Sequence, residues 1–158
     1  MGARPDLVAC WPFRVGTDGG VEILLIRRAP GRMFEGLWQG VTGRLEAGER
    51  IAAGALREVA EETGLGPADF EAFMETDLVN WFHADDLDTL LCEVVFAARI
   101  RSDAEVVISD EHDAYQWVTP DEARGLVTWP AYQEAIDRVV WLVDNPLRAV
   151  SFRLPNPG

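Results

Sequence analysis

The chain has 158 residues, 48% of them hydrophobic, which fits one globular domain spanning residues 1–158. Its 27 acidic residues outnumber 14 basic ones and give a formal net charge of −13. That charge argues against a nucleic-acid partner, because binding a phosphate backbone requires a basic surface. No apolar run approaches the ~20 residues needed to cross a bilayer, so no membrane partner is expected.

The N-terminus and the cysteines both favour a cytoplasmic location. Residues 1–6 lack the basic-then-apolar pattern of a signal peptide. Cys10 and Cys92 each lie in an apolar, strand-like stretch. Such positions predict two buried free thiols rather than a disulfide, which is typical of a reducing compartment.

The first part of the chain predicts a β-hairpin, a loop and a short third strand. Apolar runs at residues 7–13 and 21–26 flank a turn cluster at residues 16–20. The Pro-Gly pair within residues 29–36 marks a loop. Residues 37–41 then favour a short strand.

A helix within residues 43–65 is followed by three strands and then by two helices. Strands are expected over residues 70–81, 89–100 and 114–118, and helices are expected to open at Thr119-Pro120 and near Trp129-Pro130, the second running to about Val143. This order predicts an α/β or α+β fold in which helices cover both faces of a mixed sheet.

Three carboxylates in the 43–65 stretch carry the strongest chemical signal. Glu58, Glu61 and Glu62 follow one another at i, i+3 and i+4, so a helix places all three on one face. Like charges this close repel unless a cation lies among them. A hard cation such as Mg²⁺ takes oxygen ligands, so the pattern predicts a magnesium site.

Other residues of this stretch support the helix and its attachment. The stripe expected to pack on the sheet, away from the carboxylates, is Ala52, Leu56, Val59 and Thr63. Gly48 and Gly64 are candidate start and stop signals. Glu49 and Arg57 are placed for an ion pair that braces the preceding loop against the helix.

The spacing in this stretch also resembles a known family. It runs Gly43, five residues, Glu49, seven residues, Arg57-Glu58, an aliphatic residue, any residue, Glu61-Glu62, any residue, Gly64 and an aliphatic residue. This resembles the Nudix box of Nudix hydrolases at every fixed position. The resemblance implies the Nudix α/β/α sandwich, hydrolysis of a phosphoanhydride, and Mg²⁺ as the cofactor, with Mn²⁺ able to replace it.

The resemblance also implies roles for the box residues. Glu58, Glu61 and Glu62 would hold two or more ions, together with the carbonyl group of Gly43. The implied catalytic set is Glu58, Glu61, Glu62, Arg57 and Glu49. The general base is open between Glu61 and a metal-bound hydroxide that needs no dedicated base.

Arg27 and Arg28 end the second apolar run, and they must point to opposite sides of a strand. The inward one could bind a substrate phosphate through its planar guanidinium group. The alternative is two surface arginines at a strand end. Nudix enzymes often carry a phosphate-contacting basic residue here, and the resemblance favours Arg27.

Two residues just before the box are further candidates for substrate contact. Trp38 could stack on a base or a pterin ring, or it could simply pack in the core. Thr42 is nearer the expected metal site and is a candidate substrate contact.

Glu111 lies in the Asp-Glu-His run at 110–112, where a carboxylate could complete the metal site or form only an exposed acidic turn. Segments 38–43, 111–117 and 129–136 resemble bacterial dihydroneopterin triphosphate pyrophosphatases. In that group the glutamate of the Glu-His pair is a metal ligand, which implies the same role for Glu111. The chain departs from the group at its short acidic connection, residues 81–90, and at Pro130-Ala131-Tyr132, where the group has a serine-asparagine pair.

The expected function is Mg²⁺-dependent cleavage of a nucleoside-triphosphate-like substrate to a monophosphate and pyrophosphate. The substrate would be an NTP, a dNTP or dihydroneopterin triphosphate. One alternative is hydrolysis of another X-linked diphosphate, such as a dinucleoside polyphosphate or a nucleotide sugar. Another is a non-catalytic nucleotide sensor. The sequence itself is silent on oligomeric state, although Nudix relatives are often dimers and a homodimer is one option.

Overall fold

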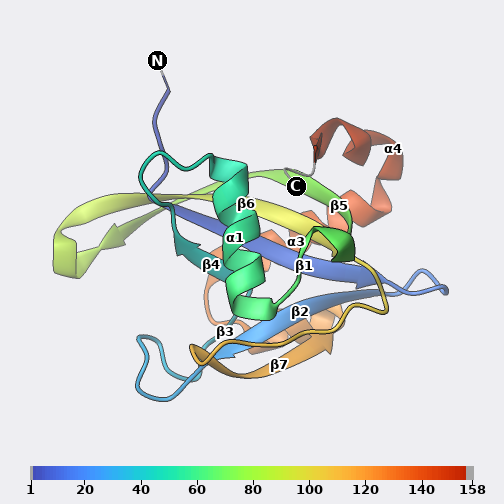
Figure 1. Cartoon of the computed structure of the whole chain (residues 1–158), viewed down its shortest axis with the longest axis horizontal. Helices are drawn as coiled ribbons and strands as arrows, with labels where there is room; N and C mark the ends of the chain where they lie inside the picture. The colour runs from blue at the N-terminus through green and yellow to red at the C-terminus, as the bar shows by residue number, and fades with distance from the viewer. Residues whose placement is uncertain (1, 156–158) are drawn as a thin grey trace.

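A mixed β-sheet forms the middle layer of the computed structural model, which describes residues 2–155 (Figure 1). Its strands within those residues are β1 (Leu7–Val15), β2 (Val21–Arg28), β3 (Trp38–Gln39), β4 (Val41–Arg44), β5 (Phe70–Ala84), β6 (Thr89–Ile100), β7 (His112–Val118) and β8 (Arg153–Leu154). The helices are α1 (Ile51–Thr63), α2 (Pro120–Leu126), α3 (Pro130–Asp144) and α4 (Pro146–Ala149), and single 3₁₀ turns cover Pro67–Asp69, Asp85–Leu87 and Val150–Phe152.

Strand β1 organises the sheet because it pairs with three others. One edge pairs in parallel with β6 from Leu7 to Phe13. The other edge pairs antiparallel with β4 over its first half and with β2 over its second half. Strand β2 in turn pairs with both β3 and β7. The sheet is therefore mixed, as the sequence predicted.

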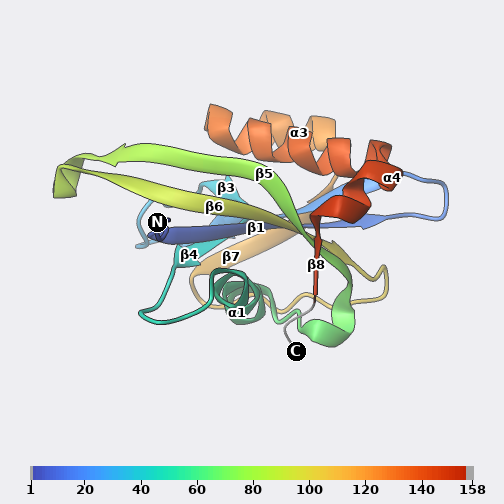
Figure 2. The ribbon, with the colours of Figure 1, turned by 90° about the horizontal axis from the view of Figure 1, so that it is seen from above.

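Each face of the sheet carries its own hydrophobic core, because side chains alternate along a strand. Val8 and Cys10 of β1 belong to the core under α1, whereas Trp11 and Phe13 belong to the core under α2 and α3. Figure 2 shows α1 on one side of the sheet and α3 on the other. We call these sides the α1 face and the α3 face. The predicted α/β/α sandwich is confirmed.

Helix α1 ends where the sequence predicts, but its buried stripe is rotated. Gly64 adopts the left-handed conformation, φ 72°, that ends many helices. The buried residues of α1 are Gly54, Ala55, Val59, Glu62 and Thr63. The expected stripe was therefore right for Val59 and Thr63, whereas Ala52 and Leu56 are only partly buried. The spacing of apolar residues could not locate the buried face of α1, because the carboxylate of Glu62 occupies part of that face.

The strand expected over residues 37–41 is two short strands separated by Gly40. A Cβ atom at this position would lie 2.8 Å from Cδ2 of the Trp11 ring, so only glycine fits between the strands. Strand β3 then pairs with β2, and β4 crosses to β1. Helix α4 and strand β8 were not predicted from the sequence.

The cysteines agree with their prediction, since Cys10 and Cys92 are both free and buried. Among the described residues, 2–155, no helix is long and apolar enough to cross a membrane.

Candidate metal and active site

An acidic cavity of about 510 Å³ opens beside α1 on the α1 face of the sheet. Its walls come from the ends of β2 and β4, from α1 and from the loop before β7. The residues that line it are Arg28, Thr42, Gly43, Arg44, Glu58, Glu61, Glu62, Ser109, Asp110 and Glu111. The three box glutamates and the glutamate that precedes β7 therefore meet at one site, as the sequence predicted.

The deepest carboxylate of this cavity is that of Glu62, whose residue is only 3% exposed. One ligand atom each of Glu62, Glu111 and His112 lies within 4.8 Å of the other two. Two buried atoms of this cluster, Glu62 Oε2 and His112 Nδ1, have no hydrogen-bond partner among the described residues. Buried polar atoms are rarely left unpaired, so these two require an explanation.

Backbone hydrogen bonds hold the loop before β7 against the end of α1. The N–H groups of Val107 and Ser109 donate to the carbonyl groups of Thr63 and Glu62, at 2.9 and 3.3 Å. On the opposite side, the N–H group of Ala29 donates to the carbonyl group of Glu111 at 2.9 Å. These bonds bring Glu111 next to the box helix although the two are far apart in sequence.

A β-bulge in β7 places His112 on the α1 face, next to Glu62 and Glu111 of the cavity. In the strand register Arg27 lies opposite Ala114, but Arg28 lies opposite His112. The backbone of Asp113 therefore has no residue opposite it on β2, which defines the bulge. Directly paired residues lie on the same face of a sheet. His112 therefore shares the α1 face with Arg28, and it is only 3% exposed.

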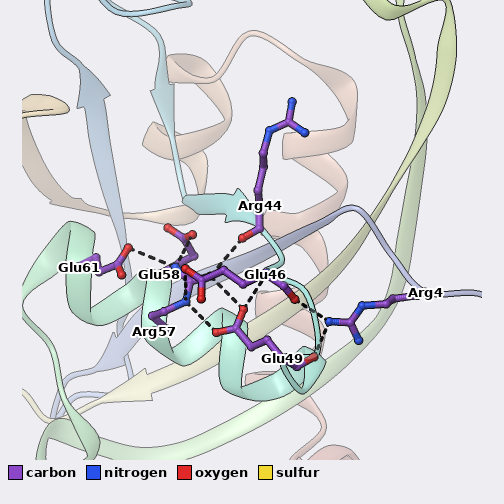
Figure 3. Close-up of polar contacts among 7 residues, drawn as sticks. All are labelled: Arg4, Arg44, Glu46, Glu49, Arg57, Glu58 and Glu61. Carbon is purple, nitrogen blue, oxygen red and sulfur yellow. Dashed lines mark hydrogen bonds and ion pairs between the residues drawn. The ribbon is translucent and has the colours of Figure 1, made fainter.

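Arg57 is the hub of the charged groups on α1 (Figure 3). Its guanidinium group donates to both carboxylate oxygens of Glu49, at 2.7 and 3.0 Å, which confirms the expected ion pair. It also donates to Glu58 at 2.8 Å and to Glu61 at 3.2 Å. A further bond reaches the carbonyl group of Arg44 at 3.1 Å. Arg57 thus ties the loop, β4 and two carboxylates of the box together.

Burial and mutual repulsion govern the charges in the cavity. Burial, together with the charges of Glu58 and Glu111, raises the pKa of Glu62 to about 9. Burial also raises the pKa of Glu58, although its bond to Arg57 opposes the rise. Burial and the nearby Arg28 charge lower the pKa of His112 to about 4, so its imidazole ring is neutral at pH 7.

These features fit a divalent cation. The carboxylate of Glu62 is buried, unpaired at Oε2 and repelled by two neighbours, and the Arg28 charge and a backbone hydrogen bond from Thr42 offset only part of this. Oxygen donors of Glu58, Glu61, Glu62 and Glu111 line one cavity, which is the donor chemistry that Mg²⁺ and Mn²⁺ accept. An acidic cluster of this kind can hold such an ion.

Gly43 lines the cavity for a steric reason. A Cβ atom at Gly43 would collide with the carboxylate group of Glu58. Any side chain here would push that carboxylate out of its place. Gly54 is constrained in a similar way, since its Cβ atom would lie 2.6 Å from Leu45 Cδ1 and 2.9 Å from Glu49 Oε2.

Arg27 and Arg28 point to opposite sides of β2, as expected, but Arg28 is the one that lines the cavity. Arg28 Nη1 lies 3.9 Å from Glu111 Oε2. Arg27 instead forms two hydrogen bonds with Asp113, at 2.8 and 3.1 Å, and its guanidinium carbon lies 5.5 Å from the ring centre of Trp38. The sequence offered no signal for this choice, because strand alternation does not say which face carries the helix.

Trp38 and Thr42 have different surroundings. Trp38 is partly buried, packs against the core of the α3 face and does not line the cavity. Thr42 does line the cavity, and its hydroxyl group donates to Glu93 Oε2 on the α3 face at 2.9 Å. The sequence analysis missed Glu93, which lies in the apolar run of β6 and gives no periodic signal.

A NUDIX domain model matches residues 4–139. The chain belongs to the NUDIX family. Members of this family hydrolyse pyrophosphate bonds of nucleotide substrates, generally with a divalent metal, and the chain is a Nudix hydrolase in that sense. The match covers the box, the cavity and all strands that line it.

Two curated relatives agree with this assignment. Nucleoside triphosphatase NudI of Escherichia coli is 30% identical over 120 residues, which cover 68% of this chain and 79% of NudI. An octanoyltransferase of Myxococcus xanthus is 37% identical over 125 residues, which cover 78% of this chain but only 33% of that protein. The chain thus spans about a third of the length of the octanoyltransferase, and the name of that longer protein is not transferred.

Solved Nudix structures share the fold. An Ap4A hydrolase of C. elegans superposes with a TM-score of 0.74 at 16% identity, over 90% of this chain and 99% of that one. The dihydroneopterin triphosphate pyrophosphohydrolase of E. coli superposes with a TM-score of 0.68 at 23% identity, over 85% and 94% of the two chains. These identities establish the common architecture, not a common substrate.

Proposed function

We propose that this Nudix hydrolase cleaves a nucleoside-triphosphate-like substrate to a monophosphate and pyrophosphate, with Mg²⁺ or Mn²⁺ as the cofactor. The observation that carries the proposal is the buried carboxylate of Glu62, whose Oε2 has no hydrogen-bond partner among residues 2–155, in a cavity shared with three further glutamates. The relationship to a nucleoside triphosphatase supports a substrate of the triphosphate type.

In this proposal Glu58, Glu61, Glu62 and Glu111 hold the divalent ions. When bound, the ions lower the pKa of water and offset negative charge on the phosphate oxygens. Arg57 and Glu49 do not line the cavity. They act by position, because Arg57 holds the carboxylates of Glu58 and Glu61 at 2.8 and 3.2 Å.

Arg28 is the residue we assign to the substrate phosphates, in place of Arg27. It lines the cavity beside Glu111 and presents a planar guanidinium group. Arg44 also borders the cavity, but its side chain extends away from Glu58 and Glu61 (Figure 3). Together with bound cations, Arg28 makes the site locally attractive to a polyphosphate although the whole chain carries a net charge of −13.

A panel of substrates tests this proposal. NTPs, dNTPs, dihydroneopterin triphosphate, a dinucleoside polyphosphate and a nucleotide sugar are each incubated with protein and Mg²⁺, and kcat/KM is measured. We expect the triphosphates to give a monophosphate and pyrophosphate in equal amounts, and EDTA to abolish turnover. In ¹⁸O-labelled water, the label shows which phosphorus atom accepts the oxygen.

Two results would overturn parts of the proposal. Turnover that survives exhaustive chelation would remove the divalent cation. A preference for the dinucleoside polyphosphate or the nucleotide sugar, with no pyrophosphate released, would instead assign the chain to hydrolysis of other X-linked diphosphates. The similarity in fold to an Ap4A hydrolase makes this second result the relevant alternative.

A further inference from the structure

His112 is a buried group that the proposed reaction does not use. It is 3% exposed, and Nδ1 has no hydrogen-bond partner within residues 2–155. Two carboxylates are close to its ring, because one ligand atom each of Glu62, Glu111 and His112 lies within 4.8 Å of the other two. Leaving a buried polar atom unpaired is unfavourable, so this arrangement indicates a missing partner.

Glu62, which lies close to His112, also has an unpaired buried atom. Its Oε2 atom is also buried without a hydrogen-bond partner in the described part of the chain. Each of the two residues thus carries an unpaired buried atom, and a ligand atom of each lies within 4.8 Å of the other and of the half-exposed carboxylate of Glu111. A single divalent ion would satisfy both atoms at once.

The position of His112 is set by its other ring nitrogen and by the bulge in β7. Nε2 lies 3.2 Å from the side-chain amide nitrogen of Gln39, which is also buried, and a half-turn of that amide would bring its oxygen to the ring instead. When the amide turns its oxygen to the ring, Nε2–H donates and Nδ1 keeps its lone pair. Such an outer hydrogen bond commonly orients a metal-binding histidine. The bulge then places the ring opposite Arg28 on the α1 face.

We propose that His112 Nδ1 is a further ligand of the ion held by Glu62 and Glu111, so that this position is a mixed nitrogen and oxygen site. The inference rests on the proposed metal site and deepens it. Mg²⁺ prefers oxygen donors, whereas imidazole nitrogen suits transition metals. The site therefore discriminates in favour of Mn²⁺, Co²⁺ or Ni²⁺ over Mg²⁺.

A simpler role for His112 makes a different prediction. If Gln39 presents its nitrogen to Nε2, then Nδ1 carries the hydrogen and would only donate to a carboxylate such as Glu62. In that case His112 steadies the carboxylate and touches no metal. Loss of His112 would then weaken the binding of Mg²⁺ and Mn²⁺ by the same factor.

Pulsed electron paramagnetic resonance of the Mn²⁺-loaded protein separates the two roles. A directly bound imidazole gives a ¹⁴N coupling to Mn²⁺. The chain contains two histidines, and the other, His83, is exposed on the β5–β6 hairpin. We expect the wild-type protein and His83→Gln to show the coupling, and His112→Gln to lose it. The coupling persisting in His112→Gln, or being absent from Mn²⁺-loaded wild type, would overturn the proposal.

Calorimetric titration gives the second measurement. We expect His112→Gln to weaken Mn²⁺ binding about 10–100-fold and Mg²⁺ binding much less. His112→Asn, which places a side-chain oxygen near the position of Nδ1, should bind Mg²⁺ as well as wild type does and still lack the nitrogen coupling. Equal weakening of both ions in His112→Gln would reject His112 as a ligand.

Failure of the underlying metal site would look different. A wild-type protein that binds neither ion at this cavity, with Glu62→Gln leaving all Mn²⁺ binding unchanged, would overturn the proposed cofactor together with the role of His112. Mn²⁺ binding that depends on Glu62 but shows no nitrogen coupling would keep the proposed function and reject only the histidine ligand. Circular dichroism of each variant confirms that its fold is retained.

Discussion

Two buried glutamates lie on opposite faces of the same sheet, and they differ in one respect. Glu93 of β6 is 7% exposed, and its two oxygens accept hydrogen bonds from Thr42 at 2.9 Å and Asn80 at 3.3 Å. Glu62 of α1 is 3% exposed, and its Oε2 has no partner among residues 2–155. Burial raises the pKa of both carboxyl groups.

The difference teaches that burial alone does not identify a functional acid. Glu93 is surrounded by protein donors, so the α3 face already compensates part of its desolvation. Glu62 instead lies near Glu58 and Glu111, whose negative charges make its ionised form still less favourable. A bound cation would offset this repulsion, because it supplies positive charge at the buried oxygen. Thr42 connects the two sites, since it lines the cavity and holds Glu93.

The largest expected effect separates these two glutamates directly. Glu62→Gln removes a proposed ligand charge and should lower kcat by roughly 10²–10³-fold, as the loss of a group that stabilises developing charge does. Glu93→Gln keeps its hydrogen bonds, because Thr42 can accept from the amide, and should change kcat by no more than about threefold.

Steady-state kinetics at saturating Mg²⁺ and substrate measures both variants. Their secondary structure is compared by circular dichroism, so that a loss of fold is not read as a loss of chemistry. Similar values of kcat for the two variants would show that the unpaired carboxylate has no special role.

A smaller effect is expected at the loop before β7. Glu111→Ala should reduce activity about 10–100-fold, and the defect should shrink as Mg²⁺ is raised, because the remaining carboxylates still bind the ion more weakly. Asp110→Ala is the matched control. Asp110 is adjacent and equally charged, but it is outside the cluster of potential ligand atoms. If both variants lost activity equally, a general charge effect would replace the ligand role.

The paired arginines of β2 test which face receives the substrate. Arg28→Ala should raise KM about tenfold, since a charged contact to phosphate is worth about 1.4 kcal/mol or more. Arg27→Ala should leave KM nearly unchanged, because Arg27 points to the α3 face and is paired with Asp113. A larger KM effect for Arg27 than for Arg28 would return the phosphate contact to Arg27.

The smallest effect is on the stability of the metal-free protein. Glu62 has a pKa of about 9 when folded, against an ordinary value of 4.5. Between these values the folded state keeps a proton that the unfolded state loses, so the free energy of unfolding falls as pH rises. The limit is about 1.4 kcal/mol per pH unit.

Urea unfolding of wild type, Glu62→Gln and Glu93→Gln from pH 5 to pH 9 measures this dependence. Each substitution should remove part of the downward slope, about 1 kcal/mol per pH unit for Glu62→Gln. Added Mg²⁺ should restore stability at high pH to the wild type and to Glu93→Gln, but not to Glu62→Gln. A wild-type slope unaffected by Glu62→Gln would contradict the raised pKa.

Much of the acidic site could be predicted because its signals are local. Glu58, Glu61 and Glu62 lie within two turns of one helix, so their common location follows from helical periodicity. The ion pair between Glu49 and Arg57 and the end of α1 at Gly64 are local for the same reason. The substrate contact could not be predicted in this way, because choosing between Arg27 and Arg28 requires knowing which face carries α1.

The amino-acid sequence by itself determined the family, the order of the elements and the carboxylates of the box, because these depend on spacing along a few turns of chain. Only the tertiary structure decided that Glu62 is buried with Oε2 unpaired, that Arg28 lines the cavity and that His112 lies close to Glu62 and Glu111. These features arise from the bulge in β7 and from backbone bonds between the loop before β7 and α1, which join residues more than 40 positions apart. Such contacts depend on how distant segments pack, and no local pattern encodes them.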